Sequence, residues 1–171
     1  ATAVVVLGCD TVSFGVAPKP AACKNTGQSR PGANAANDAG RKNLRRGIAP
    51  PDSSHPKFNK CPNDIDYQIE ADFSGLIAPG MPQAVIQLGE KFGHIMNYGD
   101  GLYAGQFIGA MYAEAFFETN GTRIIQAALK AIPQESQYAQ MARDLLAWHQ
   151  ADPTDWEKTW QLIQQKYRQD P

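Results

Sequence analysis

Apolar side chains recur at helical spacing along most of the chain after residue 60. The first series lies between a capping residue, Asn63 or Asp64, and the helix-breaking pair Pro79-Gly80. Its members stand four, four and three residues apart: Ile65, Ile69, Phe73 and Leu76. This spacing predicts one amphipathic helix that turns these side chains towards a core.

The next stretch predicts two more helices. Residues 82–96 repeat the apolar spacing until Asn97-Tyr98-Gly99, which accept left-handed backbone angles, interrupt it. Residues 102–118 are apolar on nearly every side, and Gly105 and Gly109 let neighbouring helices approach closely. We expect residues 102–118 to form the most buried helix.

Three amphipathic segments follow. One surrounds residues 124–129 and ends at Pro133, and the next is capped by Ser136. The last opens with a Thr-x-x-Glu capping box at Thr154 and Glu157, in which each side chain satisfies a free backbone N–H. Its expected inner face consists of Trp156, Trp160, Ile163 and Tyr167.

The chain before residue 60 is different in kind. Residues 35–46 predict a short helix that Gly47 ends, whereas residues 10–35 show no periodicity and are expected to be disordered. Only the AVVVL run near the start alternates like a strand. The sequence therefore predicts an all-α, multi-helix orthogonal bundle over residues 36–171, with a disordered N-terminal arm over residues 1–35.

Charge separates the same two parts. Residues 1–60 carry nine Lys or Arg against three Asp, and residues 61–171 carry seven against fourteen acidic residues. The basic part lacks interleaved aromatic residues and a dense Lys/Arg run, so we do not expect a nucleic-acid partner. No apolar run is long enough to span a membrane.

Two polar segments are candidates for chemistry. The acidic segment DIDYQIEAD places Asp64, Gln68 and Asp72 on one helix face, where they would either hold Mg²⁺ or Mn²⁺ or form a solvated acidic surface. The glycine-rich segment HIMNYGDGLYAG, residues 94–105, would either be a tight turn or bring backbone N–H groups and Asp100 to a phosphate or a ribose. Both alternatives remain open for each segment.

Three motifs carry a resemblance to a known family. The segments QIEADFSGLIAPG, MNYGDGLYAGQF and DWEKTWQL are similar to the central and later helices of ADP-ribosylglycohydrolase-like proteins, especially a bacterial branch. The similarity covers residues 36–171, the middle of that fold. It implies an all-α enzyme that hydrolyses the bond between ADP-ribose and an acceptor, with an ADP-ribosylated substrate or ADP-ribose as its partner.

The resemblance also implies a pair of Mg²⁺ or Mn²⁺ ions as cofactors of the intact family. Such ions are held by an early acidic cluster and a late Asp-x-Asp-Ser/Thr motif, and neither motif is found in this sequence. No metal ligand is therefore assigned to any position. We expect the chain to be a fragment that is inactive as given, and the alternative is a non-catalytic ADP-ribose- or nucleotide-binding module.

The resemblance supplies a set of candidate ligand-binding residues. Two belong to the acidic segment and five to the glycine-rich turn: Gln68, Asp72, Asn97, Gly99, Asp100, Gly101 and Tyr103. No catalytic residue is assigned. Localisation is left open between the cytoplasm and export, the latter if residues 3–9 are the end of a lipoprotein signal that would lipidate Cys9.

Overall fold

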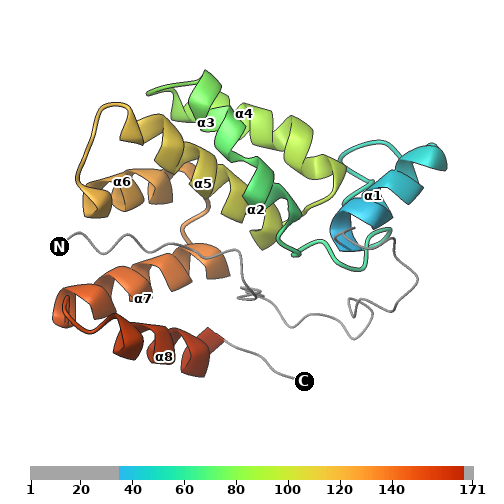
Figure 1. The fold of residues 1–171 in the computed structure, drawn as a ribbon. Helices are drawn as coiled ribbons and strands as arrows, with labels where there is room; N and C mark the ends of the chain where they lie inside the picture. The colour runs from blue at the N-terminus through green and yellow to red at the C-terminus, as the bar shows by residue number, and fades with distance from the viewer. Residues whose placement is uncertain (1–34, 168–171) are drawn as a thin grey trace.

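The computed structural model describes residues 35–167 and shows a bundle of helices (Figure 1). No strand occurs within this range, which confirms the all-α prediction. The predicted arm, residues 1–35, lies outside the described residues except for its last position. The elements are α1 (Ala35–Arg45), α2 (Asp66–Glu70), α3 (Asp72–Ile77), α4 (Pro82–Phe92), the 3₁₀ helix η2 (Gly93–Ile95), α5 (Asp100–Ala115), α6 (Gly121–Ala128), the 3₁₀ helix η3 (Leu129–Ala131), α7 (Gln137–Ala151) and α8 (Trp156–Tyr167).

Helix α5 is the centre of the bundle, as the sequence predicts. It contacts α2, α3, α4, α6 and α7, and nine of its residues are buried. A Cβ at Gly105 would lie 2.2 Å from the Tyr67 ring, and one at Gly109 would lie 2.3 Å from Oγ of Ser74. Both glycines are therefore required for α2 and α3 to lie this close to α5.

The helix predicted around Ile69 and Leu76 is present, but it faces the other way. Ala71 divides it into α2 and α3, and neither Asn63 nor Asp64 caps its start. Ile69 and Leu76, predicted to face the core, are each 51% exposed. Gly105 and Gly109 leave a shallow groove along α5. The Tyr67 ring and small side chains fit into this groove, whereas branched apolar side chains would not. The side that packs there carries Tyr67, Ala71, Ser74 and Gly75.

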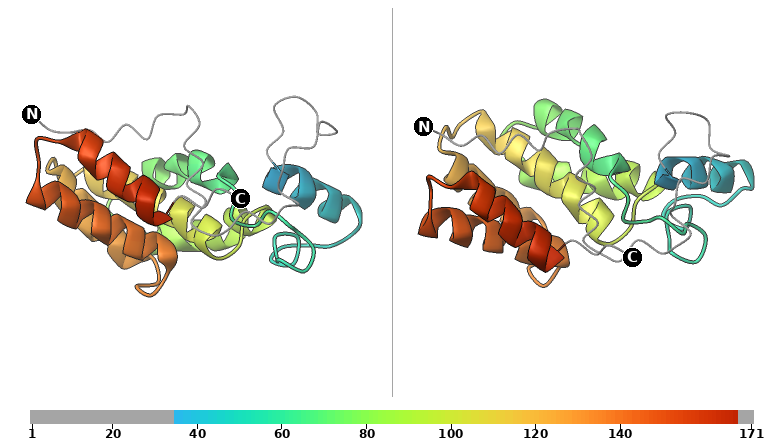
Figure 2. Two further views of the ribbon diagram at one scale, coloured as in Figure 1. Left: turned by 90° about the horizontal axis from the view of Figure 1, so that it is seen from below. Right: turned by 60° about the horizontal axis from the view of Figure 1, so that its bottom comes forward.

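The largest apolar cluster joins α5 to α6, η3 and α7. The rings of Phe107 on α5 and Tyr138 on α7 meet edge to face at 5.4 Å. Ser136 caps α7 by accepting the backbone N–H of Ala139, as the sequence predicts. In both views of Figure 2, α7 and α8 lie side by side at one edge of the molecule.

Helix α8 begins later than the sequence predicts, and only part of its expected inner face is buried. Asp155, rather than Thr154, accepts the N–H of Lys158, so the predicted capping box is absent. Trp156 is 67% exposed and Trp160 is 46% exposed, which contradicts their expected place on the inner face. Ile163 is only 6% exposed and Tyr167 packs against the main core, so these two residues lie on the inner face as predicted. Lys166 and Tyr167 also bind Asp144 of α7.

Buried asparagines attach α1 and the loop after it to the bundle. Asn43 donates to the carbonyls of Ser53 and Phe58, and Asn59 donates to those of Ala36 and Met96. Cys61, buried in the same region, is disulfide-bonded.

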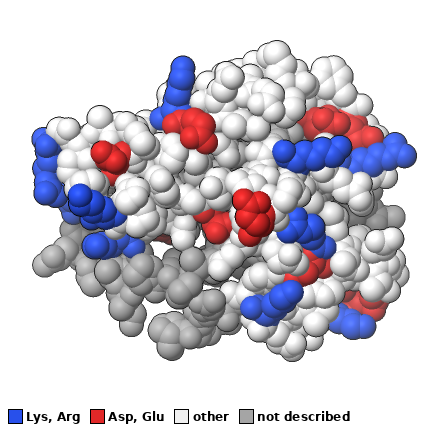
Figure 3. Space-filling view, turned by 180° about the vertical axis from the view of Figure 1, so that it is seen from behind, with Lys and Arg blue, Asp and Glu red and all other residues white. Residues whose placement is uncertain are grey.

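Basic side chains of α1 lie at the left of Figure 3, while charges of both signs are interspersed over the rest of that face. The exposed basic side chains of α1 are Arg41, Lys42 and Arg45, and Arg46 follows directly after the helix.

Candidate functional site

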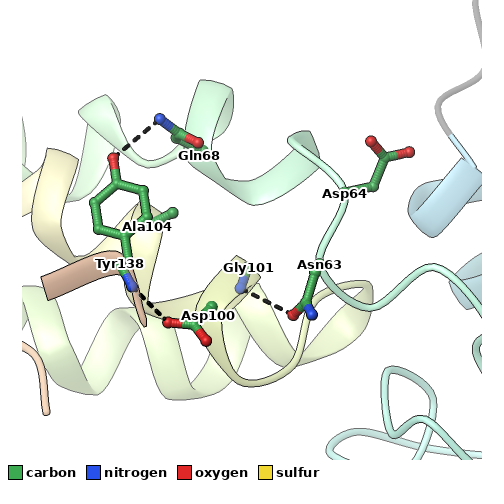
Figure 4. A pocket seen from close by; sticks show the side chains of 7 residues that line it. All are labelled: Asn63, Asp64, Gln68, Asp100, Gly101, Ala104 and Tyr138. Atoms are coloured by element: carbon green, nitrogen blue, oxygen red, sulfur yellow. Dashed lines mark hydrogen bonds between the residues drawn. The ribbon is translucent and has the colours of Figure 1, made fainter. Parts of the chain in front are cut away.

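A small polar pocket lies where the start of α5 meets α2, the start of α7 and the loop before α2 (Figure 4). Its volume is about 10 Å³, the space of roughly one water molecule. Of the seven candidate residues, Gln68, Asp100 and Gly101 line it. The complete lining is Asn63, Asp64, Gln68, Asp100, Gly101, Ala104 and Tyr138.

Asp100 holds the first turns of α5 and α7 together. Its Oδ1 accepts the backbone N–H of Tyr138 at 2.9 Å. Burial raises the pKa of the Asp100 carboxyl, and the backbone N–H groups of Tyr138 and Gln137 oppose the rise. Helix α5 has no side-chain cap, and the Asp100 carboxylate instead accepts an N–H in the first turn of α7, the helix that Ser136 caps.

Gln68 and Tyr138 close the opposite side of the pocket. The amide Nε2 of Gln68 donates to the Tyr138 hydroxyl at 3.2 Å, and Tyr138 is only 3% exposed. Burial raises the pKa of the Tyr138 hydroxyl above its usual range. Tyr138 is not among the candidate residues from the sequence, because its ring fits the apolar spacing of its helix. The signal that would have found it is the hydroxyl, because a buried phenol requires a polar partner.

The glycine-rich turn is shaped by packing. The N–H of Gly101 donates to Oδ1 of Asn63 at 3.3 Å, and a Cβ at position 101 would lie 2.5 Å from the Pro62 carbonyl oxygen. Gly99 has a φ of +58°, a backbone angle that residues other than glycine rarely adopt. Gly99 therefore sets the path of the chain into α5, and Gly101 lets the 61–65 loop rest on it.

Asn97 does not line the pocket and has no contact with solvent. It is fully buried, and its Oδ1 accepts the N–H of Tyr67 at 2.9 Å. Its Nδ2 donates to the carbonyls of Pro62 at 2.9 Å and Asp64 at 2.6 Å. Asn97 thus satisfies three backbone groups at once, and it positions the loop that carries Asn63.

The remaining candidates, Asp72 and Tyr103, lie outside the pocket. Asp72 begins α3 and accepts the N–H of Phe73 at 2.8 Å. Tyr103 packs beside the main core, and burial raises the pKa of its hydroxyl, with a further rise from Asp100. The structure thus brings together three of the seven predicted residues and gives Asn97 and Gly99 supporting positions.

Two carboxylates of the acidic segment bind the start of α1. Oδ2 of Asp64 accepts the N–H of Ala35 at 3.3 Å, and Oδ1 of Asp66 accepts that of Asn37 at 3.1 Å. The Asp64 carboxylate accordingly points towards α1 in Figure 4. Asp66 is 1% exposed, so the alternative of a solvated acidic surface is wrong at this position. Burial, followed by repulsion from Asp64, raises the pKa of Asp66 to about 7.

The acidic segment does not form a metal site in the described part of the chain. Within residues 35–167, no group of three or more His, Cys, Asp or Glu side chains is placed to hold a metal ion. One oxygen of Asp66, Oδ2, has no hydrogen-bond partner in this range, but a single orphan oxygen is not a coordination shell. The donors described here therefore do not fit Mg²⁺ or Mn²⁺.

A second polar group links α4 to the loop after α1. Nδ1 of His94 lies 3.3 Å from Oγ of Ser54, and its Nε2 lies 3.2 Å from Oε2 of Glu90. Such a Ser-His-acid chain is also found in hydrolases, but Ser54 is fully buried and donates to the Pro51 carbonyl. It has no access to a substrate, and the group fastens the loop.

Comparisons with known proteins do not assign a family. No family model matches this sequence, and no curated protein or solved structure is significantly similar to it. Among the helices of residues 35–167, none is both long and apolar enough to cross a membrane.

Proposed function

We propose that this protein is an ADP-ribosylglycohydrolase-like protein and that the pocket faces its ADP-ribose ligand. The observation that supports the proposal most is the convergence of Gln68, Asp100 and Gly101. They come from two of the motifs that resemble the family, and they meet in one polar pocket together with Tyr138.

The chemistry of the pocket suits a ribose hydroxyl. The Asp100 carboxylate, whose Oδ1 binds the Tyr138 N–H, is a charged acceptor to which a sugar O–H entering the pocket would donate. The pocket lies at the start of the 16-residue helix α5, whose dipole favours the negative charge of a nearby phosphate. A volume of about 10 Å³ admits one hydroxyl-sized group, so the rest of the ligand would lie over the pocket.

Hydrolysis itself is not assigned to any described residue. In enzymes of this family, Mg²⁺ or Mn²⁺ supplies the electrophilic assistance, and the donors of residues 35–167 do not fit these ions. The residues described here would bind and orient the ligand. We expect this chain to release no ADP-ribose from an ADP-ribosylated protein in the presence of Mg²⁺, and robust release would contradict the inactive state we propose.

Isothermal titration calorimetry with ADP-ribose tests the binding site. Asp100→Asn retains an acceptor for Tyr138 but removes the carboxylate, and it should weaken binding roughly tenfold or more. Asp72→Asn makes the same change in charge outside the pocket and should bind like the wild type. Absence of heat from the wild type at millimolar ligand would refute the proposed site.

The alternative is a non-catalytic module that binds ADP-ribose or another nucleotide. Such a module would give the same calorimetry and the same absence of hydrolysis. The DNA flanking the coding region distinguishes the two, because an ADP-ribosylglycohydrolase requires the early acidic cluster and the late Asp-x-Asp-Ser/Thr motif. Finding both motifs there would support the enzyme family, and finding neither in any frame would favour the module.

A further inference from the structure

The outward side of α2 and α3 carries a row of large apolar side chains that no described element covers. Ile65 is 37% exposed, Ile69 and Leu76 are each 51% exposed, and Ile77 is 63% exposed. Phe73 lies among them, half-buried. We call these five residues the outer stripe. Monomeric proteins seldom expose a contiguous apolar surface unless it binds something.

The outer stripe is a separate surface rather than a poorly packed part of the core. The opposite side of the same helices already rests against α5, and Figure 1 shows α2 and α3 following one another alongside it. The ring of Phe73 meets that of Phe92 edge to face at 5.5 Å, which extends the apolar surface to the end of α4. Phe92 is itself 45% exposed.

The surroundings of the outer stripe are acidic. At about 100° of rotation per residue, Glu70 and Asp72 fall on opposite borders of the stripe. Neither belongs to a salt bridge within residues 35–167. The sequence from residue 61 to residue 90 contains no Lys or Arg, and the next basic residue is exposed Lys91, beside Phe92 at the α4 end of the surface. A binding partner of complementary charge must therefore bring its own cations.

We propose that the outer stripe binds an amphipathic helix whose apolar ridge is bordered by Lys or Arg. A ridge with side chains three and four residues apart matches the spacing of the stripe, and flanking cations would meet Glu70 and Asp72. A second copy docked through the same stripe would bring like charges together. An anionic lipid surface would be repelled for the same reason. This surface is independent of the pocket, which Gln68 faces from another side of α2.

Fluorescence anisotropy with synthetic peptides tests the proposal. The probe is a fluorescein-labelled helix of about 18 residues, long enough to be helical, with Leu at every third or fourth position and Lys on both borders. The control peptide carries Glu in place of each Lys. The Lys peptide should bind the protein at least tenfold more tightly than the Glu peptide, and less tightly as salt is added.

Substitutions in the protein distinguish specific binding at the outer stripe from nonspecific binding to other exposed apolar side chains. Leu76→Ser should weaken the Lys peptide about tenfold, whereas Trp156→Ser, on exposed α8, should not change it. Glu70→Lys should weaken the Lys peptide and strengthen the Glu peptide. Equal binding of both peptides, or no binding of either, would overturn the proposal. So would self-association in sedimentation experiments that Leu76→Ser abolishes, because that result would identify a second copy as the occupant.

Discussion

The Asp100 carboxylate and the Tyr138 backbone N–H are 2.9 Å apart and join the first turn of α5 to the first turn of α7. Replacing Asp100 by Ala removes the acceptor and leaves a partly buried N–H unpaired. We expect Asp100→Ala to lose about 1–2 kcal/mol of unfolding free energy. Urea denaturation followed by circular dichroism measures this. Asp100→Asn retains an acceptor and should stay close to the wild type, and equal losses in both variants would show that the bond is unimportant.

Asp66 should make the protein less stable as the pH rises. The pKa of Asp66 is about 7 in the fold, against its usual 3.8, so between these values the folded chain keeps a proton that the unfolded chain has lost. Unfolding free energy then falls as pH increases through this window, by at most about 1.4 kcal/mol per pH unit. Above pH 7 the cost of the buried charge is fully present.

Asp66→Asn isolates this effect. The Asn oxygen still accepts the N–H of Asn37, but it carries no proton to release. The difference in unfolding free energy between the variant and the wild type should grow from pH 4 to pH 7 in favour of the variant. Two parallel curves over this range would show that the Asp66 carboxylate does not titrate as its burial requires.

Asn97 should matter for stability more than for ligand affinity. Asn97→Ala would remove the acceptor of the buried Tyr67 N–H and one donor to each of the Pro62 and Asp64 carbonyls, at a cost of about 2–4 kcal/mol. Asn63→Ala, which removes a single acceptor from the N–H of Gly101, is the matched control and should cost about 1 kcal/mol. Thermal melts of both variants measure the difference. Comparable losses would contradict the central place given to Asn97.

Gly101 and Gly121 form a matched pair of helix-start glycines. A Cβ at Gly101 would lie 2.5 Å from the backbone carbonyl oxygen of Pro62, whereas a Cβ at Gly121 has nothing within 4 Å. Gly101→Ala should therefore cost about 1–3 kcal/mol, and Gly121→Ala should be neutral or stabilise by roughly 0.5 kcal/mol. Chemical denaturation of both variants tests this, and a neutral Gly101→Ala would mean that the 61–65 loop moves away freely.

The start of α8 offers a test of capping. Asp155 accepts the N–H of Lys158 at 2.9 Å, while the Thr154 hydroxyl donates to Asp152 at 3.2 Å. Asp155→Ala should cost about 1 kcal/mol and Thr154→Ala only a few tenths. Amide hydrogen exchange in α8 should rise in the first variant alone. The reverse order would restore the capping box predicted from Thr154 and Glu157.

Periodicity located the helices well because it depends on local spacing, which each segment carries by itself. The choice of packed face depends on the neighbour. The pattern predicts the wrong face for α2 and α3, and for α8 it is right at Ile163 and Tyr167 but wrong at Trp156 and Trp160. Ile69 and Leu76 look like core residues, yet the narrow surface of α5 at Gly105 and Gly109 selects the side with Ala71. The apolar spacing within one helix carries no information about the surface of the helix against which it packs.

The pocket shows the same limit. Gln68 and Asp100 are candidates because they belong to two motifs that resemble a known family, and the fold places both in the lining. Asn97 was selected by the same argument but supports the backbone instead. Tyr138 was missed because its ring satisfies the apolar periodicity of α7, and only the bundle brings its hydroxyl to Gln68. Partners 70 residues apart are set by tertiary packing alone.

The exposed tryptophans of α8 determine which part of the protein tryptophan fluorescence can follow. The three tryptophans of the chain are Trp148 on α7 and Trp156 and Trp160 on α8, so tryptophan emission comes from that helical pair and none of it from α1 to α6. Emission should be strongly quenched by iodide, since Trp156 and Trp160 are open to water. A fluorescence-detected melt would follow the release of α8 from α7, and circular dichroism would be needed to see the rest of the bundle unfold.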